Sequence, residues 1–154
     1  MLGAITGDVV GSVYEWNNIK HKDFKPLFSP RSFFTDDSVL TVALMDAIDR
    51  SVDYGKTMHW YYTQHPHAGY GHRFHHWCKY ESDQSYNSWG NGSAMRTSAV
   101  GYAYDTIEDV LEKAKYFASF THDHPEGIKG AQATSACIFM ARKGATKEAI
   151  RTYI

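Results

Sequence analysis

A run of hydroxyl and carboxylate side chains at residues 35–38 opens the clearest helical pattern in this chain. Thr35, Asp36, Asp37 and Ser38 stand directly before an apolar stripe at helical spacing. The stripe consists of Leu40, Ala43, Leu44, Ala47 and Ile48. Thr35 or Asp36 therefore suits the N-cap of a buried helix, where a side-chain oxygen accepts from the free N–H groups of the first turn. A cap uses only one of these residues, whereas consecutive oxygen donors also suit Mg²⁺, Mn²⁺ or Ca²⁺.

Size and charge restrict what the chain can do. Its 154 residues suffice for a hydrophobic core, so we expect residues 1–154 to form a single domain. The net charge of -1, without a basic run, argues against a nucleic-acid partner. Cys78 and Cys137 lie far apart, no signal peptide precedes them, and no apolar run is long enough to cross a bilayer. We therefore expect a cytoplasmic protein without a membrane partner.

Three glycines and one acid characterise the N-terminal segment. Gly3, Gly7 and Gly11 recur every four residues, so in a helix they form one smooth stripe. Each glycine costs about 1 kcal/mol in a helix interior relative to alanine, which predicts that a large group or another backbone packs against the stripe. Asp8, an acid within this apolar segment, needs a hydrogen-bond partner or a metal-bound water.

An irregular segment follows. Residues 16–34 show no period and contain Pro26 and Pro30, so we expect a loop. Glu15 stands where this loop begins. That is a place for a movable acid or base above a site, although an ordinary surface carboxylate is the simpler interpretation.

Histidines and aromatic residues crowd residues 52–92. The histidines are His59, His65, His67, His72, His75 and His76. Their spacing matches no zinc helix or zinc knuckle, and Cys78 has no cysteine partner nearby. We therefore interpret these residues as the wall of a pocket or as the packing of a loop.

A glycine-rich turn leads into the next predicted helix. Gly90, Asn91, Gly92 and Ser93 precede apolar residues. Backbone N–H groups at such a helix entry bind phosphate oxygens, with help from the helix dipole. An ordinary tight turn uses the same residues, so the turn alone does not decide between the two interpretations.

The last third of the chain predicts three helices. Thr106 caps the first, and residues 128–142 are small and apolar, as in a helix buried on most sides. His122 lies in the loop between these two helices, where it either caps a helix or contacts a ligand. Gly144 ends the second helix, and Thr146 caps the third.

Four motifs in this order resemble those of the ADP-ribosylglycohydrolase family. They are Gly-Asp-Val-Val-Gly-Ser at 7–12, Thr-Asp-Asp-Ser at 35–38, Asn-Ser-Trp-Gly-Asn-Gly-Ser-Ala-Met-Arg at 87–96 and Thr-His-Asp-His-Pro-Glu-Gly at 121–127. Each motif is weak by itself, whereas the four in sequence are highly specific. The resemblance implies an all-α orthogonal helical bundle that encloses two divalent ions, Mg²⁺ or Mn²⁺, at the bottom of an acidic cleft.

The resemblance also implies which residues hold the metal and act in catalysis. Thr35, Asp36 and Asp37 match the family's first cluster of metal ligands, and Ser38 stands where threonine is usual. Glu15 matches an acidic residue of a mobile loop near the scissile glycosidic bond. The expected catalytic residues are therefore Glu15, Asp36 and Asp37.

Substrate contacts are implied in the same way. Gly90, Asn91, Gly92 and Ser93 match the turn that holds the diphosphate, and His122 matches a histidine of the ADP-ribose pocket. The implied ligand is ADP-ribose or an ADP-ribosylated protein. The implied reaction is hydrolysis of the N- or O-glycosidic bond that attaches ADP-ribose to a protein or a small molecule.

One family feature has no counterpart in this sequence. Family members are considerably longer, and their second metal-ligand cluster, an Asp-x-Asp-Ser/Thr motif near the C-terminus, is missing from residues 1–154. The resemblance thus implies a partial domain without the C-terminal helices, holding one metal ion or none and suited to pair with a C-terminal fragment or a second copy. The alternatives are a non-catalytic ADP-ribose-binding module and a crystallin-like structural relative.

Overall fold

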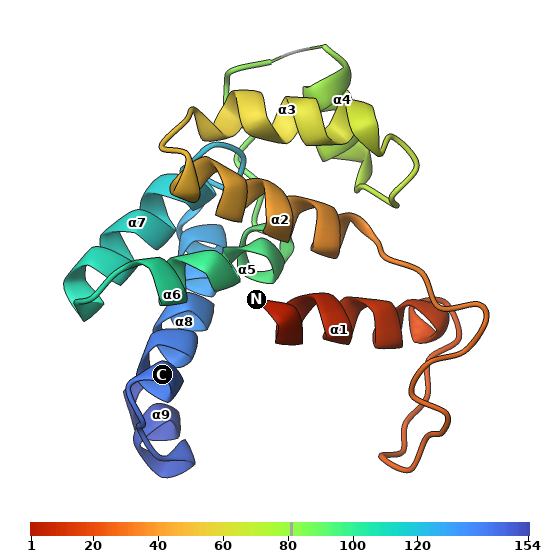
Figure 1. The fold of residues 1–154 in the computed structure, drawn as a ribbon. Helices are drawn as coiled ribbons and strands as arrows, with labels where there is room; N and C mark the ends of the chain where they lie inside the picture. Colours follow the sequence, from red (N-terminus) through yellow and green to blue (C-terminus); the bar gives the residue numbers. More distant parts are fainter. Residues whose placement is uncertain (81) are drawn as a thin grey trace.

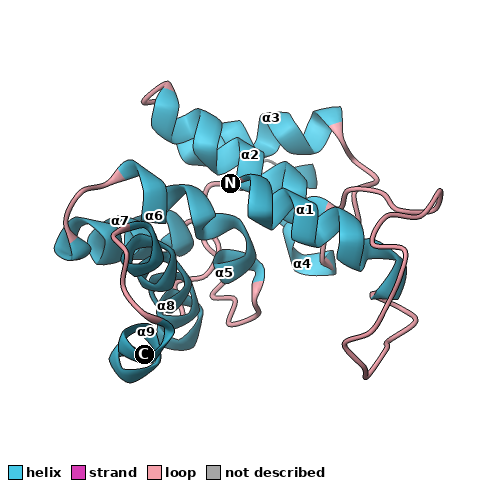
Figure 2. Cartoon of the chain, turned by 60° about the horizontal axis from the view of Figure 1, so that its bottom comes forward, coloured by secondary structure: helices cyan, strands magenta, loops and turns pink. Residues whose placement is uncertain are grey.

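The chain folds as a bundle of α-helices (Figure 1). The computed structural model describes residues 1–80 and 82–154, and in this part Figure 2 shows helices and loops but no strand. The predicted all-α class is therefore confirmed. None of the described helices has the length and apolar character that crossing a membrane requires. The helices are α1 (Leu2–Gly11), α2 (Asp36–Asp49), α3 (Tyr54–Gln64), α4 (His72–Lys79), α5 (Gly92–Arg96), α6 (Val100–Ala103), α7 (Ile107–Ser119), α8 (Pro125–Arg142) and α9 (Lys147–Tyr153), with short 3-10 helices η1 (Ser12–Tyr14) and η2 (Thr97–Ala99).

Side-chain caps determine where several of these helices begin. Thr35, one of the two residues predicted for this role, is the N-cap of α2, and its Oγ1 accepts from the N–H of Asp37 at 3.2 Å. Thr106 and Thr146 cap α7 and α9 in the same way. Gly144 follows α8 with a φ of 84°, the left-handed conformation that favours glycine. Because each cap pairs a backbone group that lacks a partner inside the helix, these residues fix the helix ends.

The hydrophobic core lies where α2, α3 and α4 meet α6, α7 and α8. α8 packs against α5, α6 and α7, while α2 packs against α1, α3 and α5. The buried apolar side chains at the centre are Leu40, Leu44, Met58, Val100 and Val110. Burying a large apolar side chain contributes about 1.5–3 kcal/mol, so this region holds the helices in place around the site.

The histidine-rich segment contains two helices, α3 and α4, that the sequence does not predict. Aromatic packing, which it does predict, joins them. Tyr62 Oη lies 2.9 Å from His75 Nδ1, and the Tyr70 ring stacks on Phe74 with centroids 5.3 Å apart. Aromatic rings and histidines occupy both the buried and the exposed faces of these helices, so the apolar periodicity that reveals a helix is hidden.

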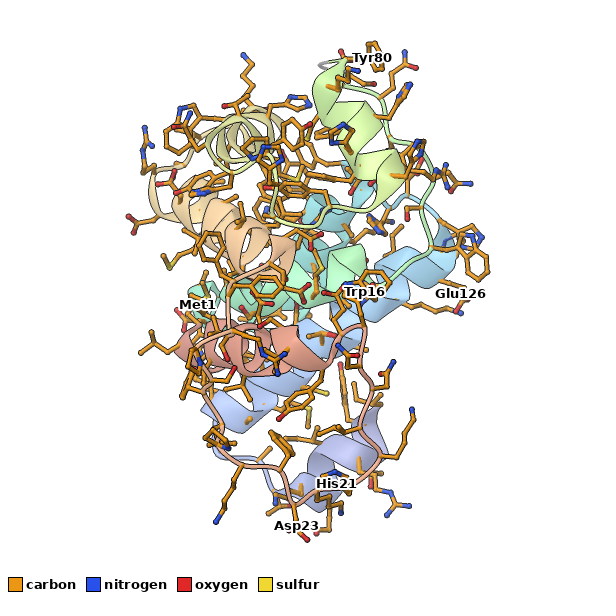
Figure 3. All side chains as sticks on the ribbon, turned by 90° about the vertical axis from the view of Figure 1, so that its right-hand side faces the viewer. Met1, Trp16, His21, Asp23, Tyr80 and Glu126 are labelled. Carbon is orange, nitrogen blue, oxygen red and sulfur yellow. The ribbon has the colours of Figure 1, made fainter. Side chains whose placement is uncertain are left out.

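α1 lies at the edge of the bundle (Figure 1). None of its residues is buried, and a Cβ added at Gly3, Gly7 or Gly11 would meet no atom within 4 Å. The close packing predicted for this glycine stripe is therefore wrong for the described residues, because no other element reaches that face. The segment at residues 16–34 is an irregular loop, as predicted, and it extends away from the helices with His21 and Asp23 at its far end in Figure 3.

Candidate functional site

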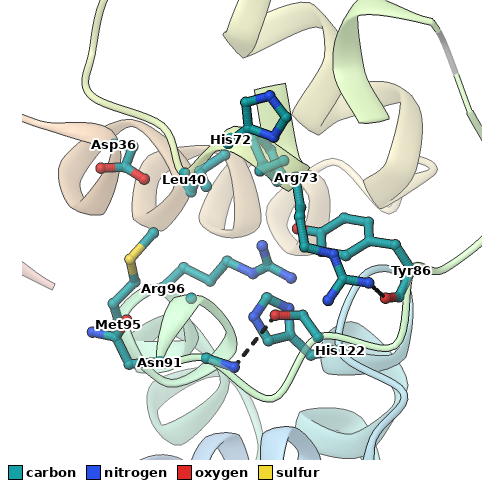
Figure 4. Close-up of a pocket in the computed structure, with 14 residues that line it drawn as sticks. Asp36, Leu40, His72, Arg73, Tyr86, Asn91, Met95, Arg96 and His122 are labelled. Carbon is teal, nitrogen blue, oxygen red and sulfur yellow. Dashed lines mark hydrogen bonds between the residues drawn. The ribbon is translucent and has the colours of Figure 1, made fainter. Parts of the chain in front are cut away.

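A cavity of about 310 Å³ opens between α2, α4, α5 and the loop that precedes α8 (Figure 4). Asp36 lies on one side, at the start of α2. Gly90, Asn91, Gly92 and His122 line the other side. These residues come from three segments that are distant in sequence, and the sequence predicts all five of them as site residues.

Asp8 organises the start of α2 from a different helix. Its carboxylate accepts from the N–H and the hydroxyl of Thr35, at 2.8 and 2.6 Å, and from the N–H and the hydroxyl of Ser38, at 3.2 and 2.5 Å. These bonds supply the partner that the sequence demands for this acid. Because both hydroxyl protons point to Asp8, lone pairs of the two hydroxyl oxygens remain available to other groups.

Four carboxylates influence one another at this corner. Burial, together with the negative charges of Asp37, Glu15 and Asp8, raises the pKa of Asp36 to about 7. Burial, followed by the charges of Asp8 and Glu15, also raises the pKa of Asp37. Every charged group that contributes to these two shifts is itself a carboxylate, so the corner attracts cations.

The donor atoms at the corner suit a hard divalent cation. Thr35, Asp36 and Asp37 offer only oxygen, which Mg²⁺ and Mn²⁺ prefer, and Thr35 Oγ1 lies 3.5 Å from Asp37 Oδ2. Among residues 1–80 and 82–154, no three His, Cys, Asp or Glu side chains gather into a metal-binding group. A cation here would take its remaining ligands from hydroxyl oxygens and water, an arrangement that Mg²⁺ commonly adopts.

Glu15 and Asp37 stand outside the cavity, and Asp36 is the predicted catalytic residue that lines it. Glu15 directly follows η1 and is exposed, at the beginning of the loop. Its charge nevertheless reaches both aspartates and raises their pKa. The structure thus brings the three predicted catalytic carboxylates to one corner, with Glu15 on the outer side.

The glycine turn forms the opposite wall. α5 begins at Gly92 and has 5 residues, so its dipole is short and the predicted binding of an anion depends on the backbone N–H groups. One of them, the N–H of Gly90, donates to Ser88 Oγ at 3.3 Å. The side chain of Ser93 is buried and donates to the carbonyl oxygen of Gly127 at 2.7 Å. Ser93 therefore anchors the turn to α8, and its hydroxyl does not face the cavity.

His122 is buried and held on several sides. Its Nδ1 lies 2.8 Å from Thr121 Oγ1. A Cβ added at Gly92 would lie 3.1 Å from His122 Nε2, and one added at Gly127 would lie 3.0 Å from His122 Cβ, so both glycines leave room for this side chain. Burial, together with the positive charge of Arg96, lowers the pKa of His122 to about 3. The imidazole is therefore neutral at physiological pH.

The sequence does not predict three residues that line the cavity, which are Arg73, Arg96 and Tyr86. Arg73 donates to the carbonyl oxygen of Tyr86, and its guanidinium lies 5.0 Å from the centre of that ring. Arg96 is only 2% exposed and donates to Thr121 Oγ1 at 2.6 Å. Arg96 closes the 87–96 motif, but nothing in the local pattern signals that an arginine at this position is buried.

Comparisons with known proteins point to the same family as the motifs. The family profile described as ADP-ribosylglycohydrolase matches residues 1–154. The chain is 28% identical to ADP-ribosylhydrolase ARH3 of Mus musculus and 27% identical to that of Homo sapiens. Each similarity covers 94% of this chain, but 48% of the mouse protein and 49% of the human protein. The chain thus spans about half the length of the curated relatives it matches.

Proposed function

Because the chain belongs to the ADP-ribosylglycohydrolase family, we propose that it binds the ADP-ribose group of a modified protein or small molecule and takes part in hydrolysing the glycosidic bond. One observation carries the proposal. Asp36 lines the same cavity as Gly90, Gly92 and His122. A corner that attracts a cation therefore faces a wall that offers backbone N–H groups. ADP-ribose presents matching groups, since its diphosphate accepts hydrogen bonds and its ribose hydroxyls coordinate hard cations.

The glycine turn is the proposed diphosphate site. Gly92 carries no side chain, so phosphate oxygens can approach the backbone N–H groups of the turn closely. The bond from Ser93 to Gly127 ties the turn to α8, which keeps these N–H groups in place before the ligand arrives. Asn91 and His122 border the same space and add polar contacts.

The acid corner is the proposed site of a divalent cation, Mg²⁺ or Mn²⁺. Thr35, Asp36 and Asp37 would hold it, while Asp8 keeps the Thr35 hydroxyl oriented with its oxygen available. When bound, such a cation supplies an activated water and stabilises negative charge that develops at the reacting bond. Glu15 borders this corner and is the proposed acid or base that moves a proton at the leaving oxygen or nitrogen.

We propose that residues 1–154 alone bind ADP-ribose but only slowly hydrolyse the bond that attaches it to a protein or small molecule. The sequence contains one metal-ligand cluster, at residues 35–37, where the family has a second. Catalysis by two cations stabilises the attacking and the leaving group together, which a single cluster cannot do. A polypeptide that carries the Asp-x-Asp-Ser/Thr motif, or a second copy of the chain, is the proposed partner that completes the site.

Isothermal titration calorimetry with ADP-ribose tests the binding site. We expect wild-type protein to bind ADP-ribose, and Gly92→Val to bind at least about tenfold more weakly, because its side chain would press on His122 and block the close approach to the turn. Gly7→Ala, a substitution in α1 where the added Cβ meets no atom, is the matched control and should bind like wild type. Unchanged affinity in Gly92→Val would remove the turn from the site.

The cation is tested in the same titration. We expect Mg²⁺ or Mn²⁺ to strengthen ADP-ribose binding by wild-type protein, and Asp36→Asn to abolish this effect while it retains binding without metal. Release of ADP-ribose from a modified protein is then measured for the chain alone and with a polypeptide that carries the missing motif. Fast release by the isolated monomeric chain would contradict the need for a second cluster.

A further inference from the structure

Arg96 is a buried cation that no carboxylate neutralises within the described part of the chain. None of the ion pairs there includes it. Its guanidinium lies 5.7 Å from the centre of the Tyr54 ring, and its Nη2 donates to Thr121 Oγ1 at 2.6 Å. Burial of an arginine without an ion pair is costly, so its place beside the cavity calls for a role beyond packing.

The hydroxyl of Thr121 lies between Arg96 and His122. Arginine can only donate, so Thr121 Oγ1 is the acceptor in the bond with Arg96. The same oxygen lies 2.8 Å from His122 Nδ1. Among the hydrogen bonds of the described residues, His122 Nδ1 is the only partner of Thr121 Oγ1 that can accept, so the hydroxyl proton of Thr121 is assigned to Nδ1.

This arrangement fixes the free nitrogen of the imidazole. A neutral histidine that accepts at Nδ1 carries its own proton on Nε2. Among the hydrogen bonds of the described residues none involves His122 Nε2, and this atom lies beside Gly92 where both residues line the cavity. Figure 4 shows the Arg96 side chain reaching toward the His122 ring and the glycine turn below it. The ring thus presents an N–H donor next to the turn.

We propose that Arg96 and Thr121 are positioning residues that hold His122 as the Nε2–H tautomer, so that it donates a hydrogen bond to a phosphate or hydroxyl oxygen of the ligand. The burial of the ring and the charge of Arg96 keep the imidazole neutral, in support of this assignment. The identity of the ligand rests on the proposed function, whereas the tautomer is a property of the free protein. Arg96 therefore acts on the ligand through two intervening side chains.

Nitrogen-15 NMR of the ligand-free, wild-type chain tests the tautomer directly. We expect the His122 spectrum to show a protonated Nε2 and an unprotonated Nδ1 that accepts a hydrogen bond. A proton on Nδ1 would overturn the inference. This measurement needs no substitution, so it decides the matter even where a variant fails to fold.

Two substitutions at Thr121 form a matched pair. Thr121→Val keeps the shape and removes the hydroxyl, so we expect a mixture of His122 tautomers and a loss of ADP-ribose affinity of roughly three- to tenfold, the range for one hydrogen bond. Thr121→Ser keeps the hydroxyl and should retain both the tautomer and the affinity. Wild-type tautomer and affinity in folded Thr121→Val would overturn the inference. Failure of wild-type protein to bind ADP-ribose would instead overturn the proposed function.

Discussion

The two walls of the cavity satisfy their polar groups in different ways. On the wall around His122, buried polar groups pair with one another, as Ser93 does with Gly127. On the acid wall, the negative charge of Asp37 raises the pKa of Asp36. The neighbouring Asp8 comes from α1, a helix that has no buried residue. The first wall is therefore organised before a ligand arrives, whereas on the second the carboxylates repel one another, and the cation proposed above would compensate their charge.

The largest effect should come from overfilling the organised wall. A Cβ at Gly127 would lie 2.7 Å from the carbonyl oxygen of Ser88 and 3.0 Å from His122 Cβ. Because one of these atoms is backbone, we expect Gly127→Ala to lower the free energy of unfolding by about 2–3 kcal/mol. Urea denaturation measures this loss. An unchanged midpoint of urea denaturation would mean that the residues around Gly127 shift to accommodate the methyl group, so that this wall is less rigid than its hydrogen bonds indicate.

The acid wall should respond most to loss of Asp8. Its carboxylate accepts four hydrogen bonds from Thr35 and Ser38, and Asp8→Ala leaves the N–H groups at the start of α2 without that acceptor. We expect the free energy of unfolding to fall by about 2 kcal/mol, since the loss of the acceptors exceeds the relief of repulsion among the carboxylates. Asp8→Asn keeps one acceptor oxygen and should lose less. Equal stability of wild type and Asp8→Ala would refute the capping role.

In metal-free protein, prepared with EDTA, titration of Asp36 and titration of His122 should change the stability in opposite directions as pH rises. The pKa of Asp36 rises from 3.8 to about 7 on folding, so the folded state holds a proton that the unfolded state releases, and stability falls as pH rises between these values. The pKa of His122 falls from 6.5 to about 3, so the unfolded state binds the extra proton and stability rises with pH in that window. The two contributions oppose each other from about pH 4 to 6.5.

Single substitutions should separate these contributions. Relative to wild type, Asp36→Asn should make stability rise more steeply with pH, and His122→Gln should make it fall more steeply, each by roughly 0.5–1 kcal/mol per pH unit after allowance for partial exposure. Urea denaturation across the window measures the slopes, which are independent of the overall stability of each variant. Parallel slopes in all three proteins would show that neither group titrates as inferred.

The smallest effect, with the opposite sign, is expected in α1. Gly7 has a helical conformation and nothing within 4 Å of an added Cβ, so Gly7→Ala should raise the free energy of unfolding by about 0.5–1 kcal/mol. The same chemical change that harms the organised wall should therefore help the edge of the bundle. Destabilisation by Gly7→Ala would show that another surface covers the glycine stripe in solution.

Sequence reasoning recovers what is local. α2 and α7 are predicted because each begins at a threonine cap and carries an apolar stripe nearby in sequence, and α9 is predicted from its threonine cap. The partners of the site are not local. Asp8 bonds to Thr35 across 27 positions, and Arg96 bonds to Thr121 across 25. The order of the motifs predicts that residues of both walls belong to one site. It does not predict which side chain donates a hydrogen bond to which.

The bonds between Asp8 and Thr35 also close the base of the loop at residues 16–34. Because these polar contacts hold the ends of the loop together, a change in its length should leave the geometry of the acid corner almost unaltered. Doubling a flexible loop costs only about 0.6 kcal/mol in closure entropy. This loop is therefore the part of the chain where insertions are tolerated most easily, because a change in its length leaves the bonds that hold the cluster at residues 35–38 in place.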